Sequence, residues 1–145
     1  MILNLDKAIK KNRDRGYEKL YWCIDLHDVI IPGTYTRNNE DRELYSYAKE
    51  VLQFLTARED MVLILWTSSH KEPVDDILKW LETFGIKFNY VNENPECPTT
   101  ELADFSKKFY FEVLIDDKAG WNGETDWKIL GFELNKFYET FSVQT

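Results

Sequence analysis

Three short polar runs, each directly after an apolar segment, carry the side chains of this sequence that are best suited to chemistry. They are Asp25 and His27 after KLYWCI, Thr67 and Ser68 after MVLILW, and Asp116 and Asp117 after EVLI. Continuous apolar runs of this length are typical of buried strands. The carboxyl ends of parallel strands lie along one edge of a sheet, where ligands bind. We therefore expect these polar groups to converge, although they are far apart in the chain.

Carboxylates gathered at one edge repel one another unless a cation neutralises them. Their oxygens suit Mg²⁺, which takes one or two carboxylates, water and a substrate phosphate. A hydroxyl from Thr67 and an ammonium from Lys108, just before the last strand, supply donors for the same phosphate. A carboxylate there can attack phosphorus and form an aspartyl phosphate. The set predicts magnesium-dependent phosphoryl transfer, with a nucleophile, a metal and a cationic clamp together.

The motifs WCIDLHDVI, LILWTSS, a lysine and VLIDDKAG follow one another in that order. This arrangement resembles the four motifs of the haloacid dehalogenase superfamily of phosphohydrolases, over residues from about 19 to 140, and is nearest to small members without a cap. The resemblance implies a three-layer α/β/α, Rossmann-like fold with a mainly parallel sheet and no cap domain. It also implies an aspartate nucleophile, Mg²⁺ and phosphatase activity. Receiver domains of response regulators use similar groups on a similar fold, but there the acidic pair comes first in the chain and the lysine last. The order in this sequence therefore excludes a receiver domain.

The resemblance also implies roles for single residues in phosphoryl transfer. Asp25 matches the nucleophilic aspartate, and Thr67 matches the hydroxyl that binds the transferring phosphoryl group, with Ser68 beside it. Lys108 matches the lysine that holds the nucleophile and the phosphate together, and Lys107 is the alternative. The expected substrate is a small phosphorylated molecule of unknown identity.

The resemblance places the metal between the first and the last motif. Asp116 and Asp117 match the acidic pair of which at least one carboxylate holds Mg²⁺. The implied ligands also include Asp25 and the backbone carbonyl of His27.

His27 is where the sequence departs from the family pattern. The usual motif is D-x-D, and its second aspartate protonates the leaving group and then activates water; this chain has D-x-H. An imidazole can exchange protons near neutral pH, so His27 is a candidate general acid and base. The alternative is a catalytically weakened protein that binds a phosphorylated ligand or a partner protein.

The remaining pattern places these residues on an alternation of strands and helices. Helices are expected over residues 40–58, from Pro73 to Gly85 and from an N-cap at Asp126 to about residue 140, with a strand over 86–91 and a loop over 92–104. Asp28 is expected in a turn, and most of the five tryptophans are expected in the core or at its edge. Strands that are apolar throughout predict a parallel sheet covered on both faces.

Length and charge bound the class of protein. The 145 residues predict a single domain over 1–145 with a basic helical arm over 1–18, and 43% hydrophobic residues exclude a disordered chain. The net charge is −8; residues 1–19 carry +3, so the rest carries −11, which argues against nucleic-acid binding. No apolar run approaches the roughly 18 residues of a membrane span. Two cysteines fit a reducing cytoplasm.

Overall fold

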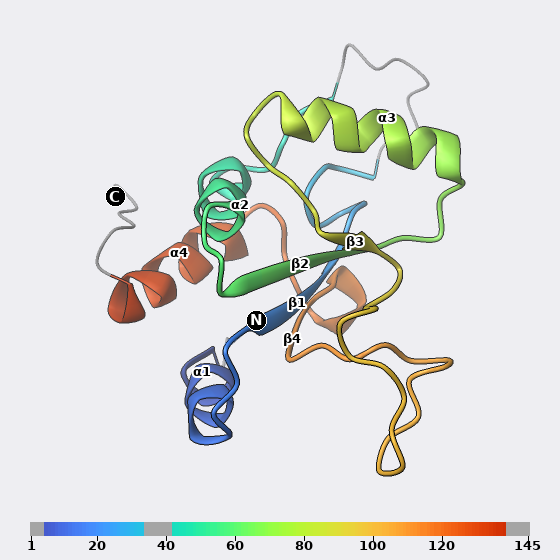
Figure 1. Ribbon diagram of the computed structural model, residues 1–145. Coiled ribbons are helices and arrows are strands. Elements are labelled where there is room, and N and C mark those ends of the chain that lie inside the picture. The colour runs from blue at the N-terminus through green and yellow to red at the C-terminus, as the bar shows by residue number, and fades with distance from the viewer. Residues whose placement is uncertain (1–4, 34–41, 139–145) are drawn as a thin grey trace.

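The structure is a computed structural model that describes residues 5–33 and 42–138 (Figure 1). Its elements in chain order are α1 (Leu5–Asp14), β1 (Leu20–Asp25), α2 (Ala48–Thr56), β2 (Met61–Trp66), α3 (Lys71–Glu82), β3 (Tyr90–Val91), β4 (Val113–Ile115), the 3-10 helix η2 (Asp117–Ala119) and α4 (Asp126–Phe137). Strands and helices alternate through most of this order, as the sequence predicts.

The four strands form one sheet in the order β3-β2-β1-β4, and every neighbouring pair is parallel. β1 therefore lies between β2 and β4 and forms backbone hydrogen bonds along both of its edges. Asp25 pairs with Trp66 across β1 and β2, and Ile24 pairs with Ile115 across β1 and β4. The carboxyl ends of β1, β2 and β4 thus form one continuous rim, which we call the carboxyl edge. The predicted α/β class with a parallel, Rossmann-like sheet is confirmed.

One face of the sheet is covered by helices. Trp22 and Ile24 of β1 point to this face, and both side chains are fully buried. Facing residues of the same core cluster come from the other strands and from the helices: Leu63, Leu65, Ile115, Val51, Leu52, Leu55, Ile77, Leu81, Trp127, Leu130 and Leu134. Figure 1 shows α2 and α4 side by side on this side of the sheet.

The other face is covered by the chain between β3 and β4, which we call the 92–112 segment. The ring of Tyr21 on β1 lies 5.9 Å from the ring of Tyr110, and its hydroxyl donates to Glu96 at 3.3 Å. Asn94 donates from its side chain to the Tyr110 carbonyl at 2.8 Å, which ties the two limbs of the segment together. The second outer layer at this position is therefore an irregular segment, in agreement with the loop expected from residue 92.

The second helix is shorter than the helical spacing over 40–58 predicts. It begins at Ala48, and residues 40 and 41 lie outside the described residues. The Tyr45 N–H donates to the Ile30 carbonyl at 3.0 Å, and Tyr47 has a left-handed φ of 68°. A left-handed residue interrupts the helical path. The apolar residues before Ala48 thus pack against the core from a turn.

The strand expected over 86–91 shrinks to Tyr90 and Val91 because side chains replace its backbone pairing. The side-chain oxygen of Asn89 accepts from the Leu63 N–H at 2.8 Å, while the Asn89 N–H donates to the Leu63 carbonyl at 2.8 Å. Further back, the Lys87 N–H donates to the Thr56 hydroxyl at 3.1 Å. This part of the chain follows β2 without forming a regular ladder.

The ends of the last two long helices also differ slightly from expectation. α3 begins at Lys71, two residues before Pro73, and the chain turns away at Gly85, whose φ is 76°. Proline is tolerated there because the first helical N–H groups have no partner within the helix. Thr125 takes the N-cap position of α4, and the Asp126 carboxylate accepts from the Asn122 N–H at 2.8 Å. Asp126 therefore braces the preceding loop instead of capping the helix.

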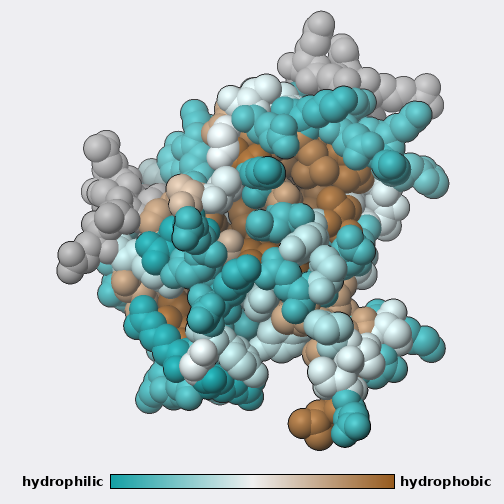
Figure 2. Space-filling view, viewed as in Figure 1, coloured by the Kyte–Doolittle hydropathy of each residue, from teal (hydrophilic) through white to brown (hydrophobic). Residues whose placement is uncertain are grey.

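The basic arm is a helix, as predicted. Leu5 and Ile9 of α1 are buried in the core, while residues 1–4 lie outside the described residues. Figure 2 shows hydrophilic side chains gathered over the outer surface of α1. Within residues 5–33 and 42–138, no helix is long and apolar enough to cross a membrane.

Candidate active site

Three carboxylates meet at the carboxyl edge. Asp25 is the last residue of β1, and Asp116 and Asp117 directly follow β4 on the adjacent strand. Asp25, Asp116 and Asp117 each place a carboxylate oxygen within 4.8 Å of the other two. We call this group the acidic triad. The convergence follows from register, because Asp25 and Asp116 each come one residue after the pair Ile24 and Ile115.

The surroundings of Asp25 disfavour its charged form. Burial is the largest cause, and a hydrogen bond with Asp117 and repulsion from both neighbouring carboxylates act in the same direction; together they raise its pKa to about 7. The Leu26 N–H donates to the Asp25 carboxylate at 2.9 Å and opposes the shift. Burial and repulsion thus hold a proton on Asp25 until near neutral pH, unless another cation replaces it.

The acidic triad fits Mg²⁺ in donor type and in spacing. All three groups offer carboxylate oxygen, the ligand atom that Mg²⁺ prefers. An octahedral ion with ligands at roughly 2.0–2.1 Å separates its ligand atoms by about 3 to 4 Å, and the triad oxygens lie within 4.8 Å of one another. The Asp116 carboxylate also accepts from the Lys118 N–H at 2.9 Å, which fixes its direction.

Thr67 lies at the end of β2 on the other side of Asp25. It is 9% exposed, and its hydroxyl oxygen accepts from the Ser69 N–H at 3.2 Å, which leaves the hydroxyl proton free to be donated. The Asn92 side chain holds both sides of the Thr67 backbone: its oxygen accepts from the Thr67 N–H at 2.8 Å, and its amide donates to the Thr67 carbonyl at 2.8 Å. The sequence did not single out Asn92, because it lies in a predicted polar loop and belongs to no motif or periodic pattern.

Two further features of this edge could receive an anion. Ser68 is exposed next to Thr67, and its contact with phosphate stays a prediction. α3 begins four residues after Thr67, so its N-terminus lies near the same edge. The unpaired N–H groups of a helix N-terminus favour negative charge.

His27 and Asp28 lie in a tight turn after β1. His27 is half-buried and forms an isolated bridge with Ile31. Asp28 has a left-handed φ of 63°, and its carboxylate accepts from the Gly33 N–H at 2.8 Å. The expected turn role of Asp28 is therefore confirmed. The Trp127 indole donates to the Val29 carbonyl at 2.6 Å, which fixes this turn to α4.

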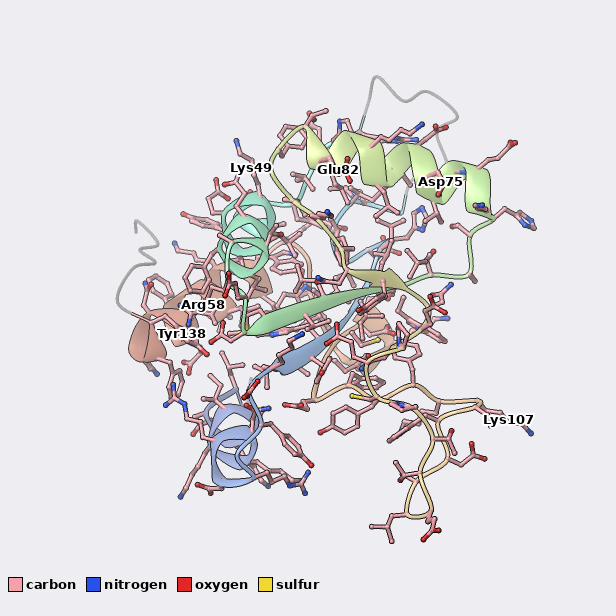
Figure 3. The ribbon with its side chains drawn as sticks, in the orientation of Figure 1. Lys49, Arg58, Asp75, Glu82, Lys107 and Tyr138 are labelled. Carbon is pink, nitrogen blue, oxygen red and sulfur yellow. The ribbon has the colours of Figure 1, made fainter. Side chains whose placement is uncertain are left out.

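The two candidate lysines lie on the 92–112 segment. Both are exposed; the Lys108 ammonium lies 5.9 Å from the centre of the Phe111 ring, and Figure 3 shows Lys107 pointing outward from the protein. Among the described residues, no hydrogen bond or ion pair joins either ammonium to the acidic triad. The structure therefore does not decide between Lys108 and Lys107. The phosphate contact of Lys108 stays a prediction.

The tryptophans divide between the core and the carboxyl edge. Trp22 and Trp127 are fully buried, and Trp121 is 4% exposed with its ring 5.0 Å from that of Trp127. Trp66 is instead 44% exposed at the end of β2. The expectation that most tryptophans lie in the core or at its edge holds for these three and for Trp80, which packs partly buried against the core. Trp66 instead presents a large apolar ring to solvent beside Asp25.

Comparison with known proteins supports the fold and names no activity. No protein-family model matches the sequence, and no curated protein matches it significantly. Among solved structures, the fold is similar to that of a conserved protein from Bacteroides thetaiotaomicron, with 25% sequence identity and a TM-score of 0.61. The match covers 83% of this chain and 93% of the other. The α/β architecture is thus shared along most of both chains.

Proposed function

We propose that this protein is a Mg²⁺-dependent phosphohydrolase of the haloacid dehalogenase type, which acts through an aspartyl phosphate on a small phosphorylated substrate. The observation that carries the proposal is the meeting of Asp25 with Asp116 and Asp117, with Thr67 held at the neighbouring strand end. Bound Mg²⁺ would supply charge neutralisation and polarise the phosphoryl oxygens. We further propose a cytoplasmic location, since Cys23 and Cys97 are both free thiols.

The first chemical step is transfer of the phosphoryl group to Asp25. Its carboxylate oxygen attacks phosphorus, a new oxygen–phosphorus bond forms, and the bond from phosphorus to the ester oxygen breaks. The protonated His27 imidazolium donates a proton to the leaving oxygen, which departs as an alcohol. The Thr67 hydroxyl, the Lys108 ammonium and the N-terminus of α3 stabilise the charge on the transferring oxygens.

The second step returns the enzyme to its starting state. His27, now neutral, accepts a proton from a water molecule that attacks the aspartyl phosphate. Inorganic phosphate leaves, and the Asp25 carboxylate and the imidazolium are restored. The Asn92 side chain keeps the Thr67 backbone in place through both steps, because it binds the N–H and the carbonyl of that residue at 2.8 Å each.

The alternative is a binding protein in which the same site holds a phosphorylated ligand without efficient turnover. The observation in its favour is His27, because an imidazole replaces the carboxylate expected of this motif. Such a protein would bind phosphate with Mg²⁺ but would hydrolyse neither alkyl nor aryl esters.

Phosphatase assays with Mg²⁺ on three proteins separate the two functions. A hydrolase is expected to release phosphate from an aryl ester, and Asp25→Asn is expected to abolish release because an amide cannot form an acyl phosphate. Asp28→Asn is the matched control; it removes a nearby carboxylate that holds a turn, and its activity should stay within about twofold of wild type. Undiminished activity in Asp25→Asn would refute the mechanism.

His27→Asp then tests the departure from the family pattern. If His27 transfers protons, the variant should shift the pH dependence towards lower pH and help alkyl esters more than aryl esters, whose leaving groups need less protonation. Activity that appears only in His27→Asp would favour the binding protein. Equal gains on both classes with an unchanged pH profile would remove His27 from proton transfer.

A further inference from the structure

Trp66 occupies a special place relative to the proposed nucleophile. It is the register partner of Asp25 on the adjacent parallel strand. Paired residues of parallel strands point to the same face and lie about 4.8 Å apart. The indole therefore lies beside the Asp25 carboxylate, on the face of the sheet that the 92–112 segment covers.

Over β1 and β2, that face is more exposed at the carboxyl edge than one row of side chains earlier. Two residues earlier on the same strands and the same face lie Cys23 and Ile64, whose side chains are 2% and 0% exposed. Asp25 is half-buried, and Trp66 is 44% exposed. Over β1 and β2, the side chains are thus covered at Cys23 and Ile64 but not at Asp25 and Trp66, so Trp66 forms one side of the opening at which Asp25 is accessible.

Two further aromatic rings extend this wall. The Trp66 and Phe109 rings lie 5.5 Å apart at 57°, and the Phe109 and Phe111 rings lie 5.7 Å apart at 60°. We call these three residues the aromatic row. The Lys108 ammonium lies 5.9 Å from the Phe111 ring, so the predicted phosphate-binding lysine belongs to the same surface. Tilted packing against Phe109 holds the indole in one orientation and reduces the entropy lost when a ligand stacks on it.

We infer that the aromatic row is a subsite for an aryl group, and that the preferred substrate is an aryl phosphate monoester such as a tyrosine phosphate. This inference rests on the proposed function, because Asp25 must receive the phosphoryl group. A ring bonded directly to the ester oxygen lies next to the phosphorus atom, within reach of a side chain one strand away. A nucleobase is separated from its phosphate by a sugar and would pass beyond Trp66.

Steady-state kinetics on a matched substrate pair test the subsite. Phosphotyrosine and phosphoserine share the amino-acid backbone and differ in the ring. Trp66→Leu should lower kcat/KM for phosphotyrosine about tenfold, as expected for the loss of one stacking contact, and leave phosphoserine within about twofold. The difference in leaving-group reactivity cancels, because each substrate is compared between the wild type and the variant.

Two control variants separate stacking from damage to the fold. Trp66→Phe keeps a ring and should retain most of the preference for phosphotyrosine. Trp80→Leu removes a tryptophan from α3, where the indole packs 5.2 Å from Phe84, and should change both substrates equally. Circular dichroism and thermal unfolding confirm that each variant is folded.

A binding experiment keeps the inference testable if turnover is absent. Calorimetric titration with Mg²⁺ present compares phenylphosphonate with methylphosphonate, which neither protein can hydrolyse. Wild type should bind the phenyl compound about tenfold more tightly, and Trp66→Leu should lose that difference. Loss of turnover with this preference intact would refute the proposed catalysis and leave the aryl subsite standing.

Three results would overturn the subsite itself. The first is an equal effect of Trp66→Leu on phosphotyrosine and phosphoserine. The second is equal affinity of the wild type for the two phosphonates. The third is a loss confined to adenosine monophosphate, which would assign the aromatic row to a nucleobase.

Discussion

Replacing Asp25 by Asn should stabilise the metal-free protein at alkaline pH and remove its response to Mg²⁺. The substitution keeps the side-chain oxygen that accepts from the Leu26 N–H at 2.9 Å, so the local geometry has little reason to change. It removes one charge from a triad whose oxygens lie within 4.8 Å of one another. The same variant thus loses a repulsion and a metal ligand at once.

Coulomb's law sets the size of the first effect. Two unit charges 4.8 Å apart repel by about 1 kcal/mol at the dielectric constant of water and by about 3 kcal/mol at an effective value of 20. Asp25 is only half-buried, so solvent screening favours the lower value. Removing its repulsion with Asp116 and Asp117 is therefore worth about 2 kcal/mol. For a chain of this length, Tm should rise by about 8 °C.

The pH dependence follows from the direction of the Asp25 shift. Its pKa is raised to about 7 in the folded protein, against an ordinary value of about 3.9 in the unfolded chain. Between those values the folded state binds more protons, so the free energy of unfolding falls as the pH rises. The advantage of Asp25→Asn should be nearly absent at about pH 4 and complete above about pH 7.

Thermal unfolding in EDTA and in Mg²⁺ measures both effects. At a hundredfold excess over Kd, Mg²⁺ should stabilise the wild type by about 2.7 kcal/mol. Asp25→Asn should lose most of that gain, whereas Asp28→Asn, whose carboxylate holds Gly33 outside the triad, should keep it. An unchanged Tm of Asp25→Asn in EDTA above about pH 7, or a full Mg²⁺ response in that variant, would refute the reasoning.

Two further predictions concern the residues that position the site. Trp127→Phe removes the donor that binds the Val29 carbonyl at 2.6 Å and should lower the free energy of unfolding in urea by about 2 kcal/mol, because the carbonyl stays buried without its partner. Trp22→Phe should cost less, since that indole donates to a weakly accepting sulfur at 3.2 Å; equal losses would argue against the hydrogen bond as the cause. Asn92→Gly tolerates the φ of 56° but loses both bonds to Thr67, so we expect kcat/KM to fall about tenfold with little change in KM. A purely structural role would lower Tm and leave kcat/KM unchanged.

The alternation of elements and the candidate residues could be predicted from the sequence because both depend on local patterns. The run Met61–Trp66 forms β2 with the bounds that its apolar side chains predict. Parallel pairing followed from the same runs, since strands apolar throughout must be covered on both faces. Once the strands are parallel, Asp25 and the pair Asp116 and Asp117 must lie at the same edge of the sheet.

Element boundaries and the surroundings of the site depended on long-range contacts. The Tyr45 N–H bonds to Ile30, which delays α2 to Ala48, and the side chain of Asn89 takes the place of a strand partner for Leu63. Each of these bonds joins residues at least 15 positions apart, which local propensity does not encode. The contact of Asn92 with the Thr67 backbone likewise joins residues 25 positions apart.

Tertiary structure alone decided which aromatic side chain faces the candidate nucleophile. In the sequence, Trp66 is one more apolar residue at the end of an apolar strand. Its exposure follows from pairing with Asp25 and from the point at which the 92–112 segment stops covering the sheet. Register and cover are properties of several segments packed together, because a side chain is buried only where another part of the chain excludes water from it.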